Sequence, residues 1–366
     1  MNPCVVERLT RTLLALSVAC GATAANPPAT AILGRPVDDP GAPLNLPVYA
    51  PAQLPGAGLR GHDFFYTGQY DFRNPTQRLV MVRGGRITWE YAIPTHAADA
   101  GRTLQEFSDA TLLPDGRVAF ARKTGAGVVG PDGRLLWNYD APAGCEVHVC
   151  QPLSGDRVLV IQNGLPARLM VIHTPDGRKE TEFELPTNGN AKMVHTQFRR
   201  ARMTAAGAFL VAHHDQDEVV EYNAQGRAIW RVAARIPWCA VRLRGGHTLI
   251  SSHDAYVREV DAEGRVVWEF TQKDVPDIAV WCLQEASRLD NGNTLISNWC
   301  PVGVVDAQGA KASEKWQSTV QALEVTADKK VVWALRAWTP PVDLGPATVV
   351  QLLDAQTGRP MAGQQR

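Results

Sequence analysis

The feature that most constrains the fold is a short segment that recurs six times along the chain. Each copy has a basic residue, two or three intervening residues and a large aromatic residue, as in Arg134–Tyr139 (RLLWNY) and Arg265–Phe270 (RVVWEF). A glycine precedes most copies in a tight turn. Repetition of this kind indicates one structural unit used several times, because a single copy cannot bury its own apolar face. The aromatic residues of the six copies are Trp89, Trp137, Phe183, Trp230, Trp268 and Trp333.

The remaining strands of one unit are visible before Trp333. A first strand at 286–289 leads into the turn Asp290–Asn293, and 294–297 forms the returning strand. A third strand at 320–325 precedes the Trp333 segment, and the same order recurs in the four copies between residues 111 and 268. Most aromatic residues are spaced about forty to fifty residues apart, which is the size of a four-stranded propeller blade. The sequence therefore predicts an all-β, six-bladed β-propeller with four-stranded blades.

The two ends of the repeat region predict how the ring closes. The first blade begins at Asp63–Tyr66 without an inner strand, whereas 348–353 is a single strand left over after the last repeat. Pairing the C-terminal strand with the N-terminal blade completes that blade and removes an exposed sheet edge. We therefore expect a signal peptide at 1–25, a Pro/Ala-rich linker or clasp at 26–60, the propeller at 61–354 and a C-terminal tail at 355–366.

The N-terminus is typical of an export signal. Arg8 and Arg11 flank a short apolar stretch at 13–18, and the small residues Ala22-Thr23-Ala24 follow it. A lipoprotein signal ending at Cys20 is disfavoured, since Ser17 stands where a branched apolar residue is usual. These features predict an exported protein, either periplasmic or secreted.

Charge and hydropathy exclude several classes of partner. The chain has 37 Lys plus Arg and 37 Asp plus Glu, so no net field attracts nucleic acid or an anionic membrane. No apolar run reaches the roughly 20 residues that a membrane-spanning helix needs. We expect no nucleic-acid partner and no membrane span.

The repeats resemble the pyrroloquinoline-quinone-like (PQQ-like) propeller repeat and, more distantly, the bacterial arylsulfotransferase-type propellers. The resemblance covers residues 62–354 and rests on Asp132–Trp137, Asp290–Leu295 and their copies. Such motifs specify a blade and not a chemistry. Quinone-dependent dehydrogenases of this repeat class have eight blades, for which this chain is too short, so the resemblance implies no quinone and we expect no cofactor.

One rim of the predicted ring collects the polar and aromatic residues. Folding each first hairpin about its turn places Glu106 near Lys123, Glu146 near Asn163, Gln197 near His214, and Trp238 near His253. The opposite rim holds plain Gly, Asn and Asp turns. Imidazole, indole and guanidinium groups together suit a small ligand with a ring and an acid group. The predicted ligand-binding residues are Arg122, Lys123, His148, His195, Gln197, Arg199, His214, Trp238, Trp281, Gln284, Glu285, Asn298 and Trp299, and the predicted catalytic candidates are His253, His213 and Glu146.

Two local patterns at this rim depend on strand alternation. Adjacent strand residues point to opposite faces, so His213 and His214 cannot both face the channel, and the sequence favours no metal site. By the same rule Arg200 and Arg202 share one face and Arg199 lies on the other.

The five cysteines beyond the signal segment suggest disulfides, as expected in an oxidising compartment. Cys282 and Cys300 fall almost opposite each other across one hairpin, which predicts a disulfide between them. Cys145 and Cys150 are close enough in sequence to close a small loop, which leaves Cys239 unpaired, so the pairing of these three stays open.

The sequence favours an exported binding propeller that recognises a small anionic or carbohydrate ligand, or an envelope protein. One alternative is a carbohydrate-active lyase or hydrolase at the propeller mouth, with His, Tyr and Arg acting on a uronate. A second, implied by the resemblance, is an arylsulfotransferase-like enzyme that passes sulfate through a histidine. Whether the protein is an enzyme stays open at this stage.

Overall fold

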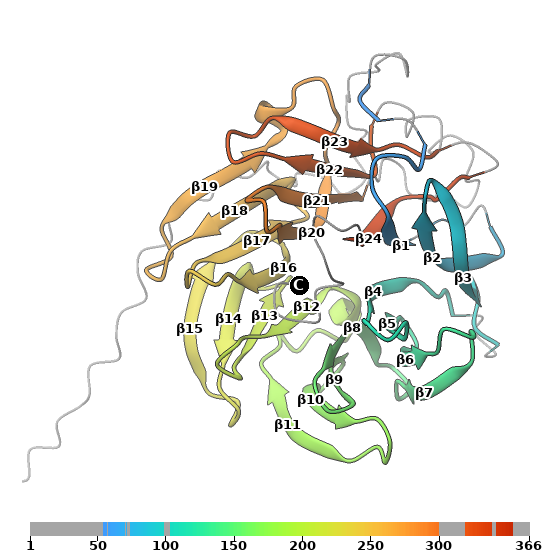
Figure 1. Cartoon of the computed structure of the whole chain (residues 1–366). Helices are drawn as coiled ribbons and strands as arrows, with labels where there is room; N and C mark the ends of the chain where they lie inside the picture. The colour runs from blue at the N-terminus through green and yellow to red at the C-terminus, as the bar shows by residue number, and fades with distance from the viewer. Residues whose placement is uncertain are drawn as a thin grey trace, which may run out of the picture.

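The computed structural model describes residues 54–353, apart from 57, 70, 72–73, 99–102, 300–318 and 339–341. In this part of the chain, six four-stranded antiparallel sheets surround a central axis as the blades of a β-propeller (Figure 1). The predicted fold class is confirmed. No helix among the described residues is long and apolar enough to cross a membrane. The predicted signal peptide and C-terminal tail lie outside the described residues.

The strands follow the chain from blade to blade. Blade 1 contains β24 (Ala347–Leu352), β1 (Phe64–Gly68), β2 (Thr76–Arg83) and β3 (Arg86–Pro94). Blade 2 contains β4 (Phe107–Leu112), β5 (Val118–Arg122), β6 (Gly125–Val129) and β7 (Leu135–Asp140). Blade 3 contains β8 (Glu146–Leu153), β9 (Arg157–Asn163), β10 (Ala167–His173) and β11 (Lys179–Leu185).

Blade 4 contains β12 (Phe198–Met203), β13 (Phe209–His213), β14 (Glu218–Tyr222) and β15 (Ala228–Ala233). Blade 5 contains β16 (Pro237–Arg242), β17 (Thr248–Ser252), β18 (Tyr256–Val260) and β19 (Val266–Thr271). Blade 6 contains β20 (Cys282–Arg288), β21 (Thr294–Trp299), β22 (Ala322–Val325) and β23 (Val331–Leu335). Two short 3-10 helices, η2 (Ala191–Thr196) and η3 (Gln272–Asp274), lie between blades in the sequence.

The ring closes as predicted. Strand β24 pairs antiparallel with β1, with Phe64 opposite Leu352 and Tyr66 opposite Val350, so the last strand of the chain is the innermost strand of blade 1 (Figure 1). All six residues of β24 are buried. The end of the predicted linker also packs on the ring, since Gly58 N donates to Arg336 O of blade 6.

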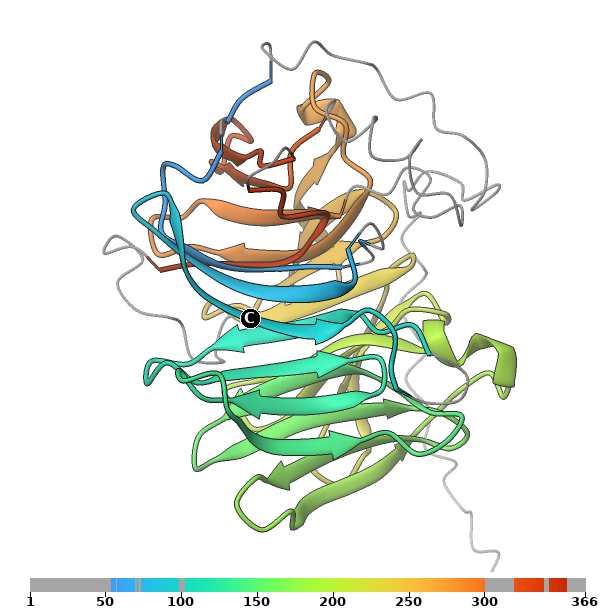
Figure 2. The ribbon, with the colours of Figure 1, turned by 90° about the vertical axis from the view of Figure 1, so that its right-hand side faces the viewer.

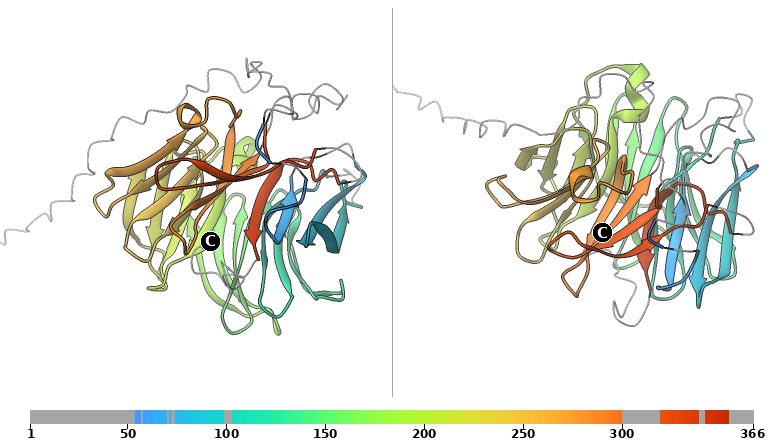
Figure 3. Two further views of the ribbon diagram at one scale, coloured as in Figure 1. Left: turned by 45° about the horizontal axis from the view of Figure 1, so that its top comes forward. Right: turned by 90° about the horizontal axis from the view of Figure 1, so that it is seen from above.

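The hydrophobic core is divided among the spaces between blades. Six clusters of buried apolar side chains occur among the described residues, and each joins two neighbouring blades. The innermost strands are almost wholly buried, whereas the outermost strands alternate between exposed and half-buried residues. Seen from the side, the blades pack face to face, and η2 projects beyond the strand ends (Figures 2 and 3).

The repeated tryptophan forms a hydrogen bond between neighbouring blades. In the outermost strand of four blades, the indole Nε1 donates to a backbone carbonyl of a neighbouring turn, at 2.8 Å for Trp230 to Ala262 and 2.8 Å for Trp268 to Ala327. Trp89 and Trp333 donate in the same way, to Pro131 and Arg60.

Blade 3 departs from the expected equivalence of the six aromatic residues. Trp89 lies opposite Met81, directly after a break in strand register, whereas the residue in that position of blade 3 is Thr181, opposite Val171. Phe183 lies two residues further along, on the same face, where it packs against Phe209 and Tyr222 of blade 4.

Candidate functional site at the inner-strand rim

Every innermost strand has a β-bulge near the same rim. In blade 3, Val147 pairs with Gln162 and Val149 with Ile161, so the residue between them has no partner in the second strand. Equivalent breaks occur in the other five blades. A bulge redirects the side chain of the extra residue and is common beside functional sites. The residues at the six breaks are Thr348, Ser108, His148, Arg199 with Arg200, Trp238 and Gln284.

Arg200, in the bulge of β12, and Arg202, two residues further along the strand, belong to one buried network. Arg200 is fully buried and donates through Nη2 to the carbonyls of Ser108 and Thr348, at 3.1 and 2.9 Å. Arg202 makes two hydrogen bonds of 2.8 Å to the carboxylate of Asp109. Burial opposes ionisation of Asp109, yet the two arginines lower its pKa. The predicted alternation of Arg199 against Arg200 and Arg202 therefore agrees with these contacts.

Glu285 belongs to this buried network and not to a ligand-binding surface. Its Oε2 lies 3.2 Å from Nη1 of Arg200, and Oε1 lies 4.0 Å from Nη2 of Arg202. Both charged partners come from β12 on another blade, so the ion pairs tie the innermost strands together. The prediction of Glu285 as a ligand-binding residue is not supported by its position.

Arg199 lies on the other side of the bulge, between two groups of rim residues. We call the first the acid–imidazole cluster, which contains Glu106, Lys123, Glu146, His148 and His195. We call the second the aromatic cluster, which contains His214, Trp238, His253, Trp281 and Trp299. Arg199 itself is 5% exposed.

Glu146 organises the acid–imidazole cluster. Its Oε2 accepts hydrogen bonds from Nε2 of His148 at 3.0 Å and from Nδ1 of His195 at 2.7 Å, while Oε1 lies 3.2 Å from Nζ of Lys123. Burial opposes the charge of Glu146, but the hydrogen bonds from the two imidazoles hold its pKa well below the usual range. Glu146 starts β8, as the predicted register with Asn163 requires.

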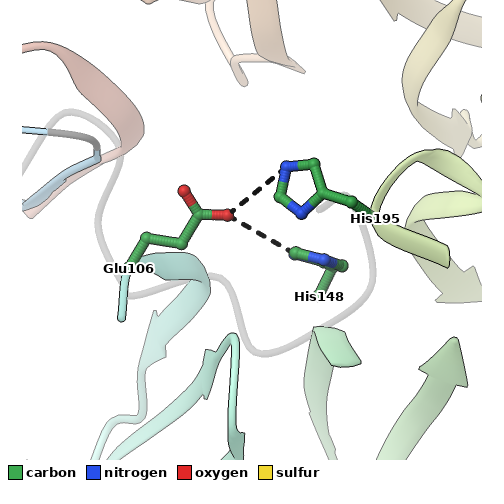
Figure 4. A group of neighbouring side chains, drawn as sticks. All are labelled: Glu106, His148 and His195. Carbon is green, nitrogen blue, oxygen red and sulfur yellow. Dashed lines mark ion pairs between the residues drawn. The ribbon is translucent and has the colours of Figure 1, made fainter. Parts of the chain in front are cut away.

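Glu106 lies next to the same two imidazoles, just before β4. Its Oε1 is 3.8 Å from Nδ1 of His148 and 4.0 Å from Nε2 of His195, and the three side chains point toward one another (Figure 4). The residue is 1% exposed, and neither carboxylate oxygen has a hydrogen bond among the described residues. Burial raises the pKa of Glu106 to about 7, although Arg199 and Lys123 oppose that shift.

The aromatic cluster contains side chains from blades 4, 5 and 6 and meets the guanidinium of Arg199 at Trp238. The guanidinium carbon lies 4.4 Å from the ring centre of Trp238, a cation–π contact. Trp238 also stacks with His253 at 6.0 Å and meets His214 edge-on at 5.5 Å. His253 is in turn 6.0 Å from Trp281 and 6.5 Å from Trp299, and both of these indoles are partly exposed.

The histidines of both clusters are neutral at physiological pH. Burial lowers the pKa of His148 to about 3, and it lowers those of His195 and His253 to about 4. The charge of Arg199 adds to the effect in all three, and the pKa of His214 is lowered for the same two reasons. The rim therefore presents uncharged imidazoles and indoles around the cations Arg199 and Lys123, with Glu146 as their counter-ion.

Several predicted residues lie elsewhere. His213 is fully buried between blades, within 2.9 Å of the hydroxyl of Tyr222 and packed on Phe198, so it does not reach the rim. The side chain of Arg122 turns outward to Asn138 and Asp140. Gln197 and Asn298 bind backbone groups, and Gln284 is buried in the bulge of β20. The catalytic role predicted for His213 is therefore wrong in position.

The predicted disulfide is also not formed. Cys282 carries a free, buried thiol, as do Cys150 and Cys239, and Cys145 is a partly buried free thiol. Cys282 lies directly opposite Trp299, so the expected hairpin register is off by one residue. Cys300 lies outside the described residues.

Sequence reasoning missed Glu106 and Ser108 as members of the site. Ser108 Oγ lies 2.8 Å from Nδ1 of His148, which links blade 2 to blade 3 at the rim. Glu106 had been placed beside Lys123 in the predicted register, and Lys123 N does donate to Glu106 O. In the sequence, Glu106 could have been found as a carboxylate at the start of an inner strand. Ser108 could not, because no sequence pattern indicates that a serine lies in a bulge.

A second concave feature lies at the opposite rim. This groove, of about 720 Å³, runs between blades 2, 3 and 4 and is lined by Leu113, Arg117, Gln151, Arg157 and Met203, among others. Its described lining has no histidine or tryptophan, and Arg117 is already paired with Asp115 and Asp156. We therefore favour the inner-strand rim on the chemistry of its side chains.

Comparison with known proteins agrees with the repeat type. Residues 189–337 match a PQQ-type family model described as outer membrane protein assembly factor BamB. These residues, less than half of the chain, are similar to the PQQ-like propeller repeat. The match covers blades 4 to 6, including the segments that carry Trp230, Trp268 and Trp333. No curated protein matches the chain.

One solved structure shows the same fold as this propeller. A protein of unknown function from Bacteroides caccae is 23% identical, with a TM-score of 0.64, and the match covers 79% of this chain and 98% of that one. A virginiamycin B lyase from Staphylococcus aureus is 13% identical with a TM-score of 0.49, covering 76% of this chain and 87% of the other. Identity this low shows the fold alone. The resemblance to arylsulfotransferase-type propellers stays a prediction.

Proposed function

We propose that this chain is an exported binding propeller, whose inner-strand rim binds a small ligand that combines a sugar or aryl ring with an acid group. Uronates, sulfated sugars and aryl acids share this chemistry. The observation that carries the proposal is Arg199, a cation at the centre of the rim with Trp238 stacked on it. Export rests on the N-terminal sequence.

The surroundings of Arg199 support an acidic ligand over a neutral one. Four nearby imidazoles are uncharged, so they donate and accept hydrogen bonds without repelling a cation or attracting an anion. Arg199 and Lys123 are positive, Glu146 is held ionised against them, and Glu106, whose pKa burial raises to about 7, is only partly ionised. A guanidinium binds carboxylate and sulfate oxygens with paired hydrogen bonds.

The indoles support a ring in the same ligand. Trp281 and Trp299 are partly exposed, and their rings lie 6.0 and 6.5 Å from that of His253. Aromatic faces stack on the apolar face of a sugar or on an aryl ring. An acid group at Arg199 would leave the attached ring within reach of these side chains.

The experiment is a ligand panel on the full chain, read by thermal shift and then by calorimetry. The panel contains glucuronate, benzoate, a sulfated sugar and, as the neutral comparison, glucose. We expect acids with a ring to bind, and R199Q to weaken them by about one to two decades, the worth of one charge-assisted hydrogen bond.

Arg242 offers a matched control. Its guanidinium also lies over an indole, 4.6 Å from the ring centre of Trp230, but between blades 4 and 5 at the opposite rim. R242Q should leave binding unchanged. Equal loss in both variants, or binding of glucose as tight as glucuronate, contradicts the proposal. Turnover of any panel member would instead support the lyase or hydrolase alternative, and binding of no small molecule would favour an envelope protein.

A further inference from the structure

Three side chains with metal-binding atoms converge at the rim from distant parts of the chain. Glu106, His148 and His195 each offer one ligand atom, and these atoms lie within 4.8 Å of one another. Oε1 of Glu106 is 3.8 Å from Nδ1 of His148 and 4.0 Å from Nε2 of His195 (Figure 4). Glu106 precedes β4, His148 lies in the bulge of β8, and His195 lies in η2. We propose that these three residues bind one divalent transition-metal ion, and that zinc is the ion they fit best.

The orientation of both imidazoles supports this site. A single oxygen of Glu146 accepts from Nε2 of His148 at 3.0 Å and from Nδ1 of His195 at 2.7 Å. An ionised carboxylate only accepts, so the hydrogen of each neutral ring lies on the Glu146 side. Nδ1 of His148 and Nε2 of His195 then carry the lone pairs, and these are the atoms that face Glu106. Metal-binding histidines are fixed in this way by a carboxylate on the other ring nitrogen.

Glu106 is the second, independent observation. Its carboxylate is 1% exposed and has no hydrogen-bond partner among the described residues, although it points at the two imidazoles. Leaving a buried polar group unsatisfied is unfavourable. An ion between Glu106 and the two nitrogens would satisfy the carboxylate.

The donor set and its spacing select the class of ion. Two imidazoles and one carboxylate suit zinc and its neighbours more than magnesium or calcium, which prefer oxygen ligands. Two ligands about 2.0–2.1 Å from a tetrahedral zinc are roughly 3.3 Å apart. The distances of 3.8 and 4.0 Å from Glu106 require the side chains to move inward by about half an ångström.

Two existing contacts must change when an ion binds. Ser108 Oγ lies 2.8 Å from Nδ1 of His148, and Nη1 of Arg199 lies 3.5 Å from the same nitrogen. The serine hydroxyl has to rotate away, and the guanidinium opposes a cation beside it. Removing the charge of Arg199 should therefore strengthen metal binding, although the same change should weaken the acidic ligand proposed above. Because the same change should raise the affinity for metal and lower the affinity for the acidic ligand, the two proposals can be tested separately.

The experiment is a titration of the full, chelator-treated chain with Zn²⁺ by calorimetry, with Co²⁺ as a spectroscopic probe of coordination. We expect one ion per chain and at least a tenfold weaker affinity in E106Q and H195A. E146Q, which removes the orienting carboxylate, should weaken binding by about 10–100-fold. R199Q should bind Zn²⁺ more tightly than the wild-type chain.

The matched control is another histidine–carboxylate pair. Nδ1 of His247 lies 2.7 Å from Oε1 of Glu259 at the opposite rim, so H247N should leave the affinity unchanged. Absence of Zn²⁺ binding, or equal affinity in E106Q, H195A and the wild type, overturns the proposal. If a variant does not fold, NMR of the wild-type chain tests the site. Adding Zn²⁺ should shift the imidazole resonances of two of the nine histidines. A spectrum in which no imidazole resonance shifts contradicts the site.

Discussion

The propeller has two rings of β-bulges, and they carry very different residues. In the outermost strands the bulged residue directly precedes the position of the repeated tryptophan, and four of the six are exposed aliphatic residues, namely Leu136, Ile229, Val267 and Val332. In the innermost strands the bulged residues are Thr, Ser, His, Arg, Trp and Gln. The outer ring repeats the same arrangement, a bulge followed by an aromatic residue that joins two blades. The inner ring uses the same backbone device in every blade to present a different side chain, as a site requires.

Deleting the last strand tests both rings at once and should have the largest effect. Without residues 347–366, β1 becomes an open edge at the channel and the buried Arg200 loses its bonds to Thr348. We expect an insoluble or unfolded product, measured by soluble yield and circular dichroism. Deleting only 355–366 should leave the melting temperature unchanged. A soluble, folded product of the longer deletion would show that the ring does not need β24.

The two adjacent arginines of the β12 bulge should differ sharply in their effect on stability. Replacing Arg200 by Met leaves Glu285 buried without one of its charged partners and should cost about 3–5 kcal/mol of unfolding free energy. Replacing Arg199 by Met removes a cation–π contact and should cost about 1 kcal/mol. Urea denaturation measures both. Similar losses would mean that the inner ring is structural throughout.

The outer ring offers a similar adjacent pair. Trp268 donates to Ala327 of the next blade and packs in the cluster between blades 5 and 6, so W268A should cost about 3–5 kcal/mol. Its neighbour Val267 is 50% exposed, and V267A should change the free energy by no more than about 0.5 kcal/mol. Equal losses in thermal or urea unfolding would contradict the assignment of the tryptophan as the residue that joins blades.

Acid should destabilise the fold through its buried histidines. Burial lowers the pKa of His213 to about 3, and Arg231 adds to the shift, while Tyr222 and Gln216 contact the ring. When the pH is below the ordinary histidine pKa of about 6.5, His213 is protonated in the unfolded chain but stays neutral in the folded chain. Stability therefore falls as the pH drops from about 6.5 toward 3, by up to about 1.4 kcal/mol per pH unit for this group.

The variant H213Q isolates that contribution. It should show a shallower loss of unfolding free energy between pH 6.5 and 4 than the wild-type chain. An unchanged slope in H213Q would mean that His213 is protonated without cost.

The repeats in the sequence were sufficient for the fold, because the outer ring uses similar residues in each blade. Trp230, Trp268 and Trp333 recur with the same neighbours, and hairpin alternation gave the register of Glu146 with Asn163. The inner ring was only partly predictable. A bulge shifts the register by one residue without any marker in the sequence, which is why Cys282 lies opposite Trp299.

Contacts between blades also could not be predicted from the sequence. Strand alternation separated Arg199 from Arg200 and Arg202, but it could not show that Glu285 would meet those two arginines. His195 and Glu146 were predicted separately, and only the fold brings them within 2.7 Å. Side chains from different blades carry no shared periodicity, so their convergence follows from ring geometry.

The central claim is that the inner-strand rim, and not the groove at the opposite rim, is the binding surface. Hydrogen-exchange mass spectrometry on the full chain tests it directly, with any ring-bearing acid that raises the melting temperature. We expect slower exchange in the segments 106–108, 146–148, 195–199 and 238, which line the rim. Protection confined to 113–117 and 154–157, which line the groove, would contradict it.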